Sequence, residues 1–195
     1  MDRKELDSRL DKMFYPASVA VVGASDVPVK WGNLILTSIL GWEFKGKVFP
    51  VNPKKDKLLG LPCYPSITAI PDPVDLAVLV IPAPHVPAVM RECVAKGIPT
   101  AVVISSGFRE MGDEGARIEE ELVEIARGGG TVFMGPNTMG IASAHGWLEA
   151  LPTPTGPKPG GLSIISQSGN LGLQILKWVA HKAIDSVKPS DHYIC

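Results

Sequence analysis

The segment Ser166–Asn170 has the residue types and the position of an anion-binding loop. It follows the apolar run Leu162–Ile165 and precedes a stretch with a helical apolar pattern. A helix N-terminus presents unpaired N–H groups and the positive end of the helix dipole, and both favour negative charge. Ser166 and Ser168 add hydroxyl donors and Gly169 allows close approach, so we predict a phosphate site. The structural alternative is that Ser168 only caps the helix.

A second candidate loop, Gly23–Gly32, follows the apolar run Ser18–Val22. In an open α/β sheet, ligands bind beyond the carboxyl ends of the strands, so this loop is the default phosphate or nucleotide site. Gly23 permits a tight exit from the strand, and a helix that starts near Gly32 presents free N–H groups. The loop does not match G-x-G-x-x-G and is longer than that motif, so a plain structural turn is the alternative.

Two lysines stand where a dinucleotide-binding domain would place an acid. Lys54 and Lys55 follow the run Lys47–Val51, at a point where a carboxylate would accept hydrogen bonds from ribose hydroxyls. An ammonium group instead neutralises phosphoryl oxygens, so these residues favour a phosphate-bearing ligand over NAD. The alternative is a solvated lysine run on a loop.

Three further strand ends carry turn residues or small polar groups that would let a ligand approach the backbone. They are Ile81–Pro84, Ser105–Phe108 and Gly135–Gly140. Each could be a simple connector. Together they would line one edge of one sheet, which favours a binding site there.

The sequence shows no catalytic or metal-binding pattern. The four histidines have no ligand spacing with Cys, Asp or Glu; they are His85, His145, His181 and His192. A Walker A loop, a G-x-S-x-G elbow and a metal motif are all missing. We therefore predict no catalytic residue and no metal site in this chain.

The elements that would position these loops alternate between strand and helix. Apolar, β-branched runs predict strands of a parallel sheet covered on both faces; they are Ser18–Val22, Lys47–Val51, Leu76–Ile81, Thr100–Ile104 and Thr131–Met134. Pro50 weakens the second run and suggests that it lies near an edge of the sheet. Helical spacing or composition predicts helices in residues 1–13, Asn33–Leu40, Val86–Val94 and Ile118–Ala126. This alternation predicts a Rossmann-like, doubly wound α/β domain with a mainly parallel sheet.

The composition of the chain predicts a second unit after this domain. We assign residues 1–150 to the Rossmann-like domain and residues 151–160, with four prolines and two glycines, to a stiff linker. Residues 161–195 would be the truncated start, one βα unit, of a second, flavodoxin-like α/β domain. One such unit cannot form a sheet, so we expect it to be covered by a second copy or by missing parts of the protein, or to be loosely ordered.

Length and charge limit the possible functions. The 195 residues are 45% hydrophobic and carry a net charge of −1, which gives no reason to expect nucleic acid as a partner. The N-terminus has no apolar signal region, and no stretch is long and apolar enough to span a membrane. Cys63, Cys93 and Cys195 show neither zinc nor disulfide spacing. We expect a reducing, cytoplasmic compartment.

A series of short motifs resembles one family. FYPASVAVVGAS, KWGN, KVFPVNPK, PCYPSI, VDLAVLVIPA, KGIPTAVVISSGF, GPNTMGI and LSIISQSGNLG occur in the order seen in NDP-forming acyl-CoA synthetases. These include ADP-forming acetate–CoA ligases and, more distantly, the α subunit of succinyl-CoA synthetase. The family's reaction links an acyl-CoA thioester to nucleoside triphosphate synthesis through an acyl phosphate and a phosphohistidine.

The resemblance implies that coenzyme A is the ligand and assigns residues to its parts. The candidate CoA-binding residues are Gly23, Ala24, Ser25, Lys30, Lys54, Lys55, Pro82, Ile104, Ser105, Ser106, Pro136 and Asn137. Within this set, the loop at Gly23–Ser25 with Lys30 would meet the CoA phosphates, and Lys54 or Lys55 a further phosphate or the adenosine. Ser105 and Ser106 would flank the pantetheine, and Pro136 and Asn137 would lie near the thiol.

The same resemblance implies that other domains or subunits carry part of the reaction. The start of the last predicted helix, with Ser166, Ser168 and Gly169, would receive the phosphate of phosphohistidine. No residue here matches that histidine, and the family often has Cys where this chain has Thr138. The chain would therefore be inactive alone and need an ATP-grasp partner or further domains; a homo-oligomer is also possible. The alternative is a stand-alone CoA- or nucleotide-binding regulatory module without catalysis.

Overall fold

The computed structural model describes residues 1–156, 158–182 and 193–194, and the predictions for His192 and Cys195 lie outside this range. Its main feature is a five-stranded sheet in which every neighbouring pair is parallel. The strand order is β2-β1-β5-β6-β7. The strands are β1 (Ser18–Val22), β2 (Lys47–Val51), β5 (Leu76–Leu79), β6 (Thr100–Val103) and β7 (Val132–Met134). The predicted parallel sheet is confirmed, with β2 at its edge.

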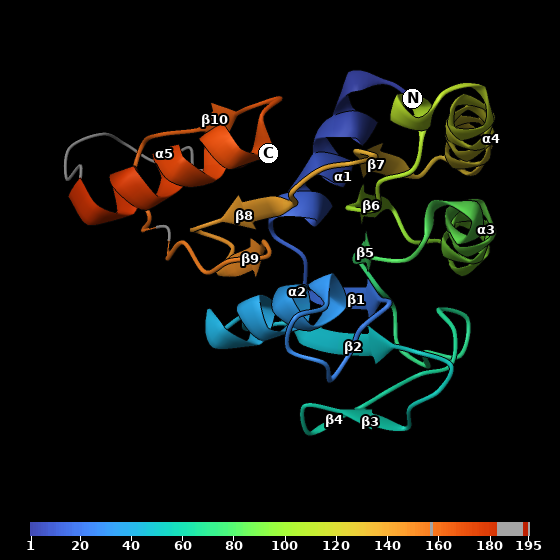
Figure 1. Ribbon diagram of the computed structural model, residues 1–195, viewed down its shortest axis with the longest axis horizontal. Helices are drawn as coiled ribbons and strands as arrows, with labels where there is room; N and C mark the ends of the chain where they lie inside the picture. The colour runs from blue at the N-terminus through green and yellow to red at the C-terminus, as the bar shows by residue number, and fades with distance from the viewer. Residues whose placement is uncertain (157, 183–192, 195) are drawn as a thin grey trace.

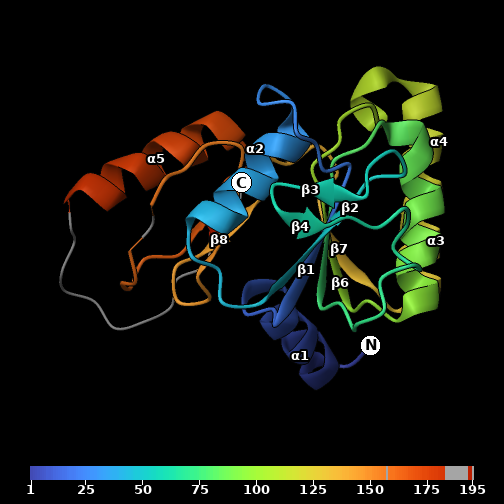
Figure 2. The same cartoon turned by 90° about the horizontal axis from the view of Figure 1, so that it is seen from below.

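The helices cover both faces of this sheet, as predicted (Figure 1). Helices α3 and α4 lie together on one face, and α1 and α2 lie on the other (Figure 2). The helices of this domain are α1 (Arg3–Phe14), α2 (Trp31–Gly41), α3 (Val86–Lys96) and α4 (Asp113–Gly129), with 3-10 turns at Ala83–His85 and Arg109–Met111. The doubly wound α/β fold is confirmed.

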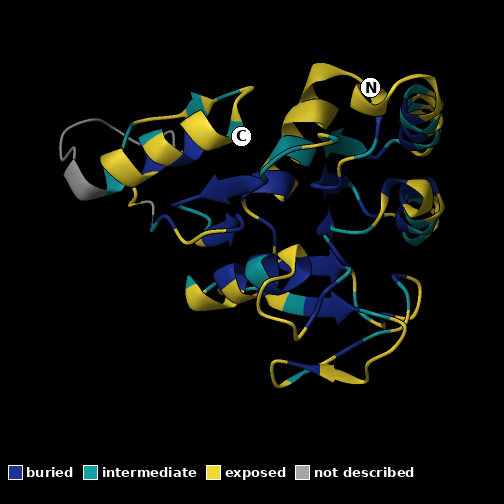
Figure 3. Cartoon of the chain, in the orientation of Figure 1, coloured by how far each residue is buried: buried dark blue, intermediate teal, exposed yellow. Residues whose placement is uncertain are grey.

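Alternating residues of each strand form two cores. In β1, Ala20 and Val22 pack with α3 and α4, whereas Val19 and Val21 pack with α1 and α2. The strands are therefore buried on both faces, which is why they read as continuous apolar runs in the sequence. The buried sheet and its largely exposed outer helix faces are distinguished in Figure 3.

The edge of the sheet beyond β2 carries two small additions. Strands β3 (Lys57–Leu58) and β4 (Leu61–Pro62) form an antiparallel hairpin. Directly after it, Tyr64 makes a single parallel bridge to Val51. With Tyr64 counted as a rudimentary strand, the order is that of a dinucleotide-binding sheet, with the change of direction between β1 and β5.

A second sheet follows the first and was not predicted. Strands β8 (Ile141–Ser143) and β9 (Leu148–Ala150) form an antiparallel hairpin, and β11 (Tyr193–Ile194) pairs with both β8 and β10 (Ile164–Ile165). The strand at β10 thus finds its partner within the chain, in contrast to the expected cover by a second copy. Helix α5 (Gly169–Lys182) packs on this sheet through Leu173 and Leu176. In Figure 1, the β8–β9 hairpin lies between α5 and α2.

The stretch expected to be a linker is partly buried. Leu151 joins the small core under α5, and Pro152 is buried. Thr155 is 8% exposed and donates its hydroxyl to the Glu149 carboxylate at 2.6 Å. Residues 151–155 are therefore attached to the β8–β9 hairpin.

Among the described residues, no helix combines the length and the apolar character needed to cross a membrane.

Candidate functional site

A cleft, which we name the main cleft, lies at the carboxyl edge of the parallel sheet. It has a volume of about 390 Å³ and is formed by the ends of β5 and β6, the loop after β7 and the start of α2. Its lining comprises Trp31, Val80, Ile81, Pro82, Ile104, Ser105, Ser106, Asn137, Thr138 and Met139. This is where the connections of the sheet leave in opposite directions, which is the usual ligand position in an open α/β sheet.

Two glycines fix the start of α2 at this edge. Gly23 has φ +87°, and a Cβ there would lie 2.2 Å from the Val80 carbonyl oxygen of the neighbouring strand end. A Cβ on Gly32 would lie 1.9 Å from the Gly23 carbonyl oxygen. The first turn of α2 therefore lies directly on the backbone at the end of β1, with its N-terminal N–H groups near the cleft.

The loop between β1 and α2 is held by its own hydrogen bonds. The Asn33 side-chain amide donates to the Ser25 carbonyl at 3.0 Å, and the Asn52 amide donates to the Ala24 carbonyl at 2.8 Å. The Ser25 hydroxyl accepts a hydrogen bond from the backbone N–H of Val27 at 3.1 Å. The loop is thus preorganised, and Asn52 occupies the position where NAD-binding domains place an acid.

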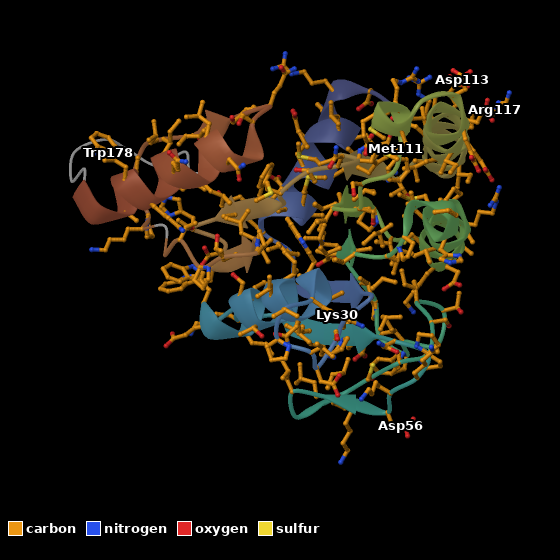
Figure 4. The ribbon with its side chains drawn as sticks, in the orientation of Figure 1. Lys30, Asp56, Met111, Asp113, Arg117 and Trp178 are labelled. Atoms are coloured by element: carbon orange, nitrogen blue, oxygen red, sulfur yellow. The ribbon has the colours of Figure 1, made fainter. Side chains whose placement is uncertain are left out.

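The predicted lysines lie at the outer end of this edge. Lys55 forms an ion pair with Asp26, with 2.6 Å between Nζ and Oδ2, and so connects the ends of β2 and β1. The hydrogen bond from Lys55 holds the pKa of the Asp26 carboxyl below its ordinary value, so this acid stays charged near neutral pH. Lys54 is exposed, and Lys30 stands at the N-cap position of α2, where it is labelled in Figure 4.

Ser105 holds the strand ends together instead of facing a ligand freely. Its hydroxyl accepts from the Ile81 N–H at 3.2 Å, and its carbonyl accepts from the Asn137 N–H at 2.9 Å. Ser106 is exposed on the cleft wall. The Gly135–Pro136 peptide bond is cis, and Asn137, the next residue, lines the cleft.

A second hollow of about 320 Å³ lies on the other side of Ile81 and Pro82. It is formed by the ends of β1 and β2, residues 65–67 and the start of α3. Its apolar lining includes Val22, Val51, Ile67 and Val89, and its polar groups come from Asn52, Ser66, His85 and Glu92. Because Ile81 and Pro82 line both hollows, the second hollow and the main cleft are neighbours at the carboxyl edge of the sheet.

The predicted phosphate loop reaches the same region from the second sheet. A Cβ on Gly169 would lie 1.9 Å from the Met139 Cγ, so the start of α5 lies against the end of the main cleft. The Ser168 hydroxyl accepts from the Leu171 N–H at 3.4 Å, which is the capping contact. The Ser166 hydroxyl donates to the Ser168 carbonyl at 2.9 Å. Ser168 therefore caps α5, and the same helix start also lies against the main cleft.

The structure brings half of the predicted CoA-binding residues to the two hollows. Pro82, Ile104, Ser105, Ser106 and Asn137 line the main cleft, and Gly23 with Pro82 lines the second hollow. The predicted residues outside both described linings are Ala24, Ser25, Lys30, Lys54, Lys55 and Pro136. Sequence reasoning missed Trp31 and Met139, although each is close in sequence to a predicted residue. The described residues contain no group of three or more His, Cys, Asp or Glu suited to a metal.

Comparisons with known proteins identify the family of this chain. The CoA binding domain family matches residues 17–144. The chain is 44% identical over 169 residues to acetate–CoA ligase (ADP-forming) I of Archaeoglobus fulgidus, which covers 87% of this chain and 24% of that relative. It is 43% identical over 173 residues to the α subunit of acetate–CoA ligase (ADP-forming) I of Pyrococcus furiosus, covering 87% and 37%.

A solved structure shows the same similarity in three dimensions. The dinucleotide-forming acetyl-coenzyme A synthetase 1 of Ca. Korarchaeum cryptofilum, in complex with phosphate and ADP, superposes with a TM-score of 0.87 at 40% identity. The match covers 95% of this chain and 39% of that one. The chain thus spans between about a quarter and two fifths of the length of these relatives.

Proposed function

Because the chain belongs to the CoA binding domain family, we propose that it binds coenzyme A at the carboxyl edge of its parallel sheet. Its relatives include ADP-forming acetate–CoA ligases and one of their α subunits. We assign it the role of the CoA-binding portion of an NDP-forming acyl-CoA synthetase. The full reaction converts acyl-CoA, NDP and phosphate to carboxylate, NTP and CoA.

The observation that carries this proposal is the combination of groups at one edge. A helix N-terminus is fixed on a glycine carbonyl, lysines lie at the outer end of the same edge, and a cleft lined by apolar and neutral polar residues continues from it. Coenzyme A has a matching order of phosphates, a long uncharged pantetheine arm and a thiol. NAD has no such arm, and its ribose would meet Asn52 where it needs a carboxylate.

Each part of coenzyme A then has a place. The Gly23–Ser25 loop, the start of α2 and Lys30 would hold the diphosphate, while Lys54 and Lys55 would hold the 3′-phosphate. The pantetheine would pass Pro82, Ile104 and Ser106 and bring its thiol to Pro136 and Asn137. These assignments rest on the lining of the main cleft and on the lysine positions.

The second half of the reaction would need groups from elsewhere. Histidine is absent from the described lining of the main cleft, so the phosphohistidine would be supplied by another domain or subunit, together with the nucleotide site. The start of α5, with Ser166, Ser168 and Gly169, would receive its phosphoryl group beside Met139. Cys63 and Cys93 are free thiols, which fits a reducing, cytoplasmic compartment.

Calorimetric titration tests the assignment of the ligand. CoA should bind more tightly than dephospho-CoA, and NAD should bind weakest. Substitution of both Lys54 and Lys55 by Ala should weaken CoA roughly tenfold, since charge-assisted contacts to phosphate are worth about 1–3 kcal/mol. The same substitution should leave dephospho-CoA nearly unaffected.

The strand β2 itself offers the matched control. Lys47 stands at its amino end and pairs with Asp72 at 2.9 Å, much as Lys55 pairs with Asp26 at its carboxyl end. Lys47→Ala should not change CoA binding. NAD binding as tight as CoA binding, or equal losses from Lys47→Ala and Lys55→Ala, would contradict the proposal.

A further inference from the structure

A third hollow adjoins the main cleft and has no role in holding coenzyme A. This side groove, of about 410 Å³, lies between the start of α2 and the first turns of α5. In Figures 1 and 2 the two helices lie on the same side of the parallel sheet. The lining residues are Trp31, Leu34, Met139, Pro152, Thr153, Asn170, Leu173, Gln174 and Lys177.

The side groove and the main cleft share two walls. Trp31 and Met139 line both, and Asn137, at the end of the main cleft, is two residues from Met139. A thiol held at Asn137 would therefore lie near the passage between the two hollows. A group attached to that thiol would continue into the side groove.

The chemistry of the side groove suits an apolar group. Trp31, Leu34, Met139 and Leu173 supply its large apolar side chains, Lys177 is its one described charged lining residue, and its described lining contains no Asp or Glu. Asn170 and Gln174 supply neutral amides on the α5 side. Since a water molecule occupies about 30 Å³ in the liquid, a volume of about 410 Å³ leaves room for much more than an acetyl group.

The passage between the main cleft and the side groove has a flexible side chain, Met139, on one side. Met139 has a flexible, unbranched side chain whose Cγ occupies the space that a Cβ of Gly169 would take. The backbone at Trp31, the first residue of α2, is held by the contact between Gly32 and Gly23, and the Trp31 side chain is 43% exposed. The Met139 side of the passage can therefore adapt by a change of rotamer.

We propose that the side groove binds the acyl group of the thioester and selects apolar acids with a medium-length chain or an aromatic ring over acetate. This inference rests on the proposed function, because it requires the CoA thiol to lie near Asn137. Trp31 and Met139 form the passage, and Leu34 and Leu173 contact the far part of the chain.

The test compares the binding of CoA thioesters to the full chain, which requires no turnover. Hexanoyl-CoA and phenylacetyl-CoA should bind roughly tenfold more tightly than CoA, because each buried methylene adds affinity. Acetyl-CoA should bind like CoA.

Two substitutions in the side groove, at positions that do not line the main cleft, test whether the tighter binding of hexanoyl-CoA comes from this groove. Leu34→Gln places an amide in the side groove, and Thr153→Trp fills it from its exposed rim. Both should abolish the gain for hexanoyl-CoA and leave the Kd for CoA unchanged. Leu40→Gln, at an exposed position of the same helix, is the control and should retain the gain.

The possible results separate the two proposals. If the unaltered chain binds CoA but hexanoyl-CoA no better than acetyl-CoA, the acyl site is wrong and the CoA site stands. A gain that survives in both Leu34→Gln and Thr153→Trp also refutes it, because the acyl group then lies elsewhere. Failure of the unaltered chain to bind CoA at all would overturn the proposed function itself.

Discussion

Helices α2 and α5 both begin at the main cleft, but they are attached to it in different ways. The start of α2 lies on backbone, with Gly32 against the Gly23 carbonyl and no side-chain cap at Lys30. The start of α5 lies on the flexible side chain of Met139. Backbone cannot give way, whereas a methionine can adopt another rotamer. The rigid α2 end therefore suits a ligand part that stays the same, as the CoA phosphates of the proposed function would, and the α5 end suits a group that changes during a reaction.

The largest expected effect comes from a methyl group at the rigid contact. Gly32→Ala would place a Cβ 1.9 Å from the Gly23 carbonyl oxygen, so α2 must shift. We expect a loss of about 2–3 kcal/mol in the free energy of unfolding, the upper range for overpacking. Urea denaturation measures it, and CoA binding should be lost in parallel.

The same helix provides the control for this loss. Gly41, the last residue of α2, would meet nothing within 4 Å if it carried a Cβ. Gly41→Ala should therefore be neutral or stabilise the fold by up to about 1 kcal/mol. If the two variants behaved alike, the glycine contact at the start of α2 would not fix the helix.

A smaller effect is expected at the adaptable contact. Gly169→Ala also creates a close approach, 1.9 Å from the Met139 Cγ, but a side chain with three rotatable bonds can move aside. The free energy of unfolding should change by less than about 1 kcal/mol, and CoA binding should be retained. A loss as large as that of Gly32→Ala would show that the two helices are attached equally rigidly, which would break the comparison.

The smallest effect concerns an ion pair at the rigid end. Asp26 holds Lys55 in the absence of ligand, so Asp26→Asn should free the lysine and tighten CoA binding roughly twofold to fivefold, because exposed pairs are weak. Asp72→Asn, which frees Lys47 at the far end of β2, should have no effect.

The pH dependence sharpens this prediction. The Lys55 hydrogen bond lowers the pKa of Asp26 from its ordinary value of 3.8. A depressed carboxyl pKa means that the pair is present above that value and is lost only as the pH falls through the lowered pKa. The gain from Asp26→Asn should therefore be the same at pH 6 and pH 8 in calorimetric titrations. A gain that disappears between these values would contradict the assignment to this ion pair.

The sequence predicted the parallel sheet because its strands are buried on both faces. Ser18–Val22 and Lys47–Val51 have the same bounds in the structure, and the run beginning at Leu76 ends two residues earlier than predicted. The β8–β9 hairpin was missed because its strands have only three residues each, too few to show a period. Its partner β11 lies about fifty residues away in the sequence, and no local pattern indicates such a pairing.

The candidate site was predictable only where it follows directly from a strand end. Pro82, Ser106 and Asn137 line the main cleft because parallel strands end at one edge. Trp31 and Met139 could not be found this way, since they enter through the placement of α2 and α5. The ion pair between Lys55 and Asp26 was also missed, because it joins two loops separated by a helix and a strand.

The attachment of residues 151–155 to the β8–β9 hairpin determines where this protein can be shortened. Glu149 is only 1% exposed, and its carboxylate accepts hydrogen bonds from both the N–H and the hydroxyl of Thr155. A polypeptide that stopped at Ala150 would leave this charge without those donors, and Ala142 would lose the residues that cover it, Leu151, Leu173 and Leu176. For expression of the CoA-binding part on its own, the last residue should therefore be chosen beyond Thr155, and not at the first proline.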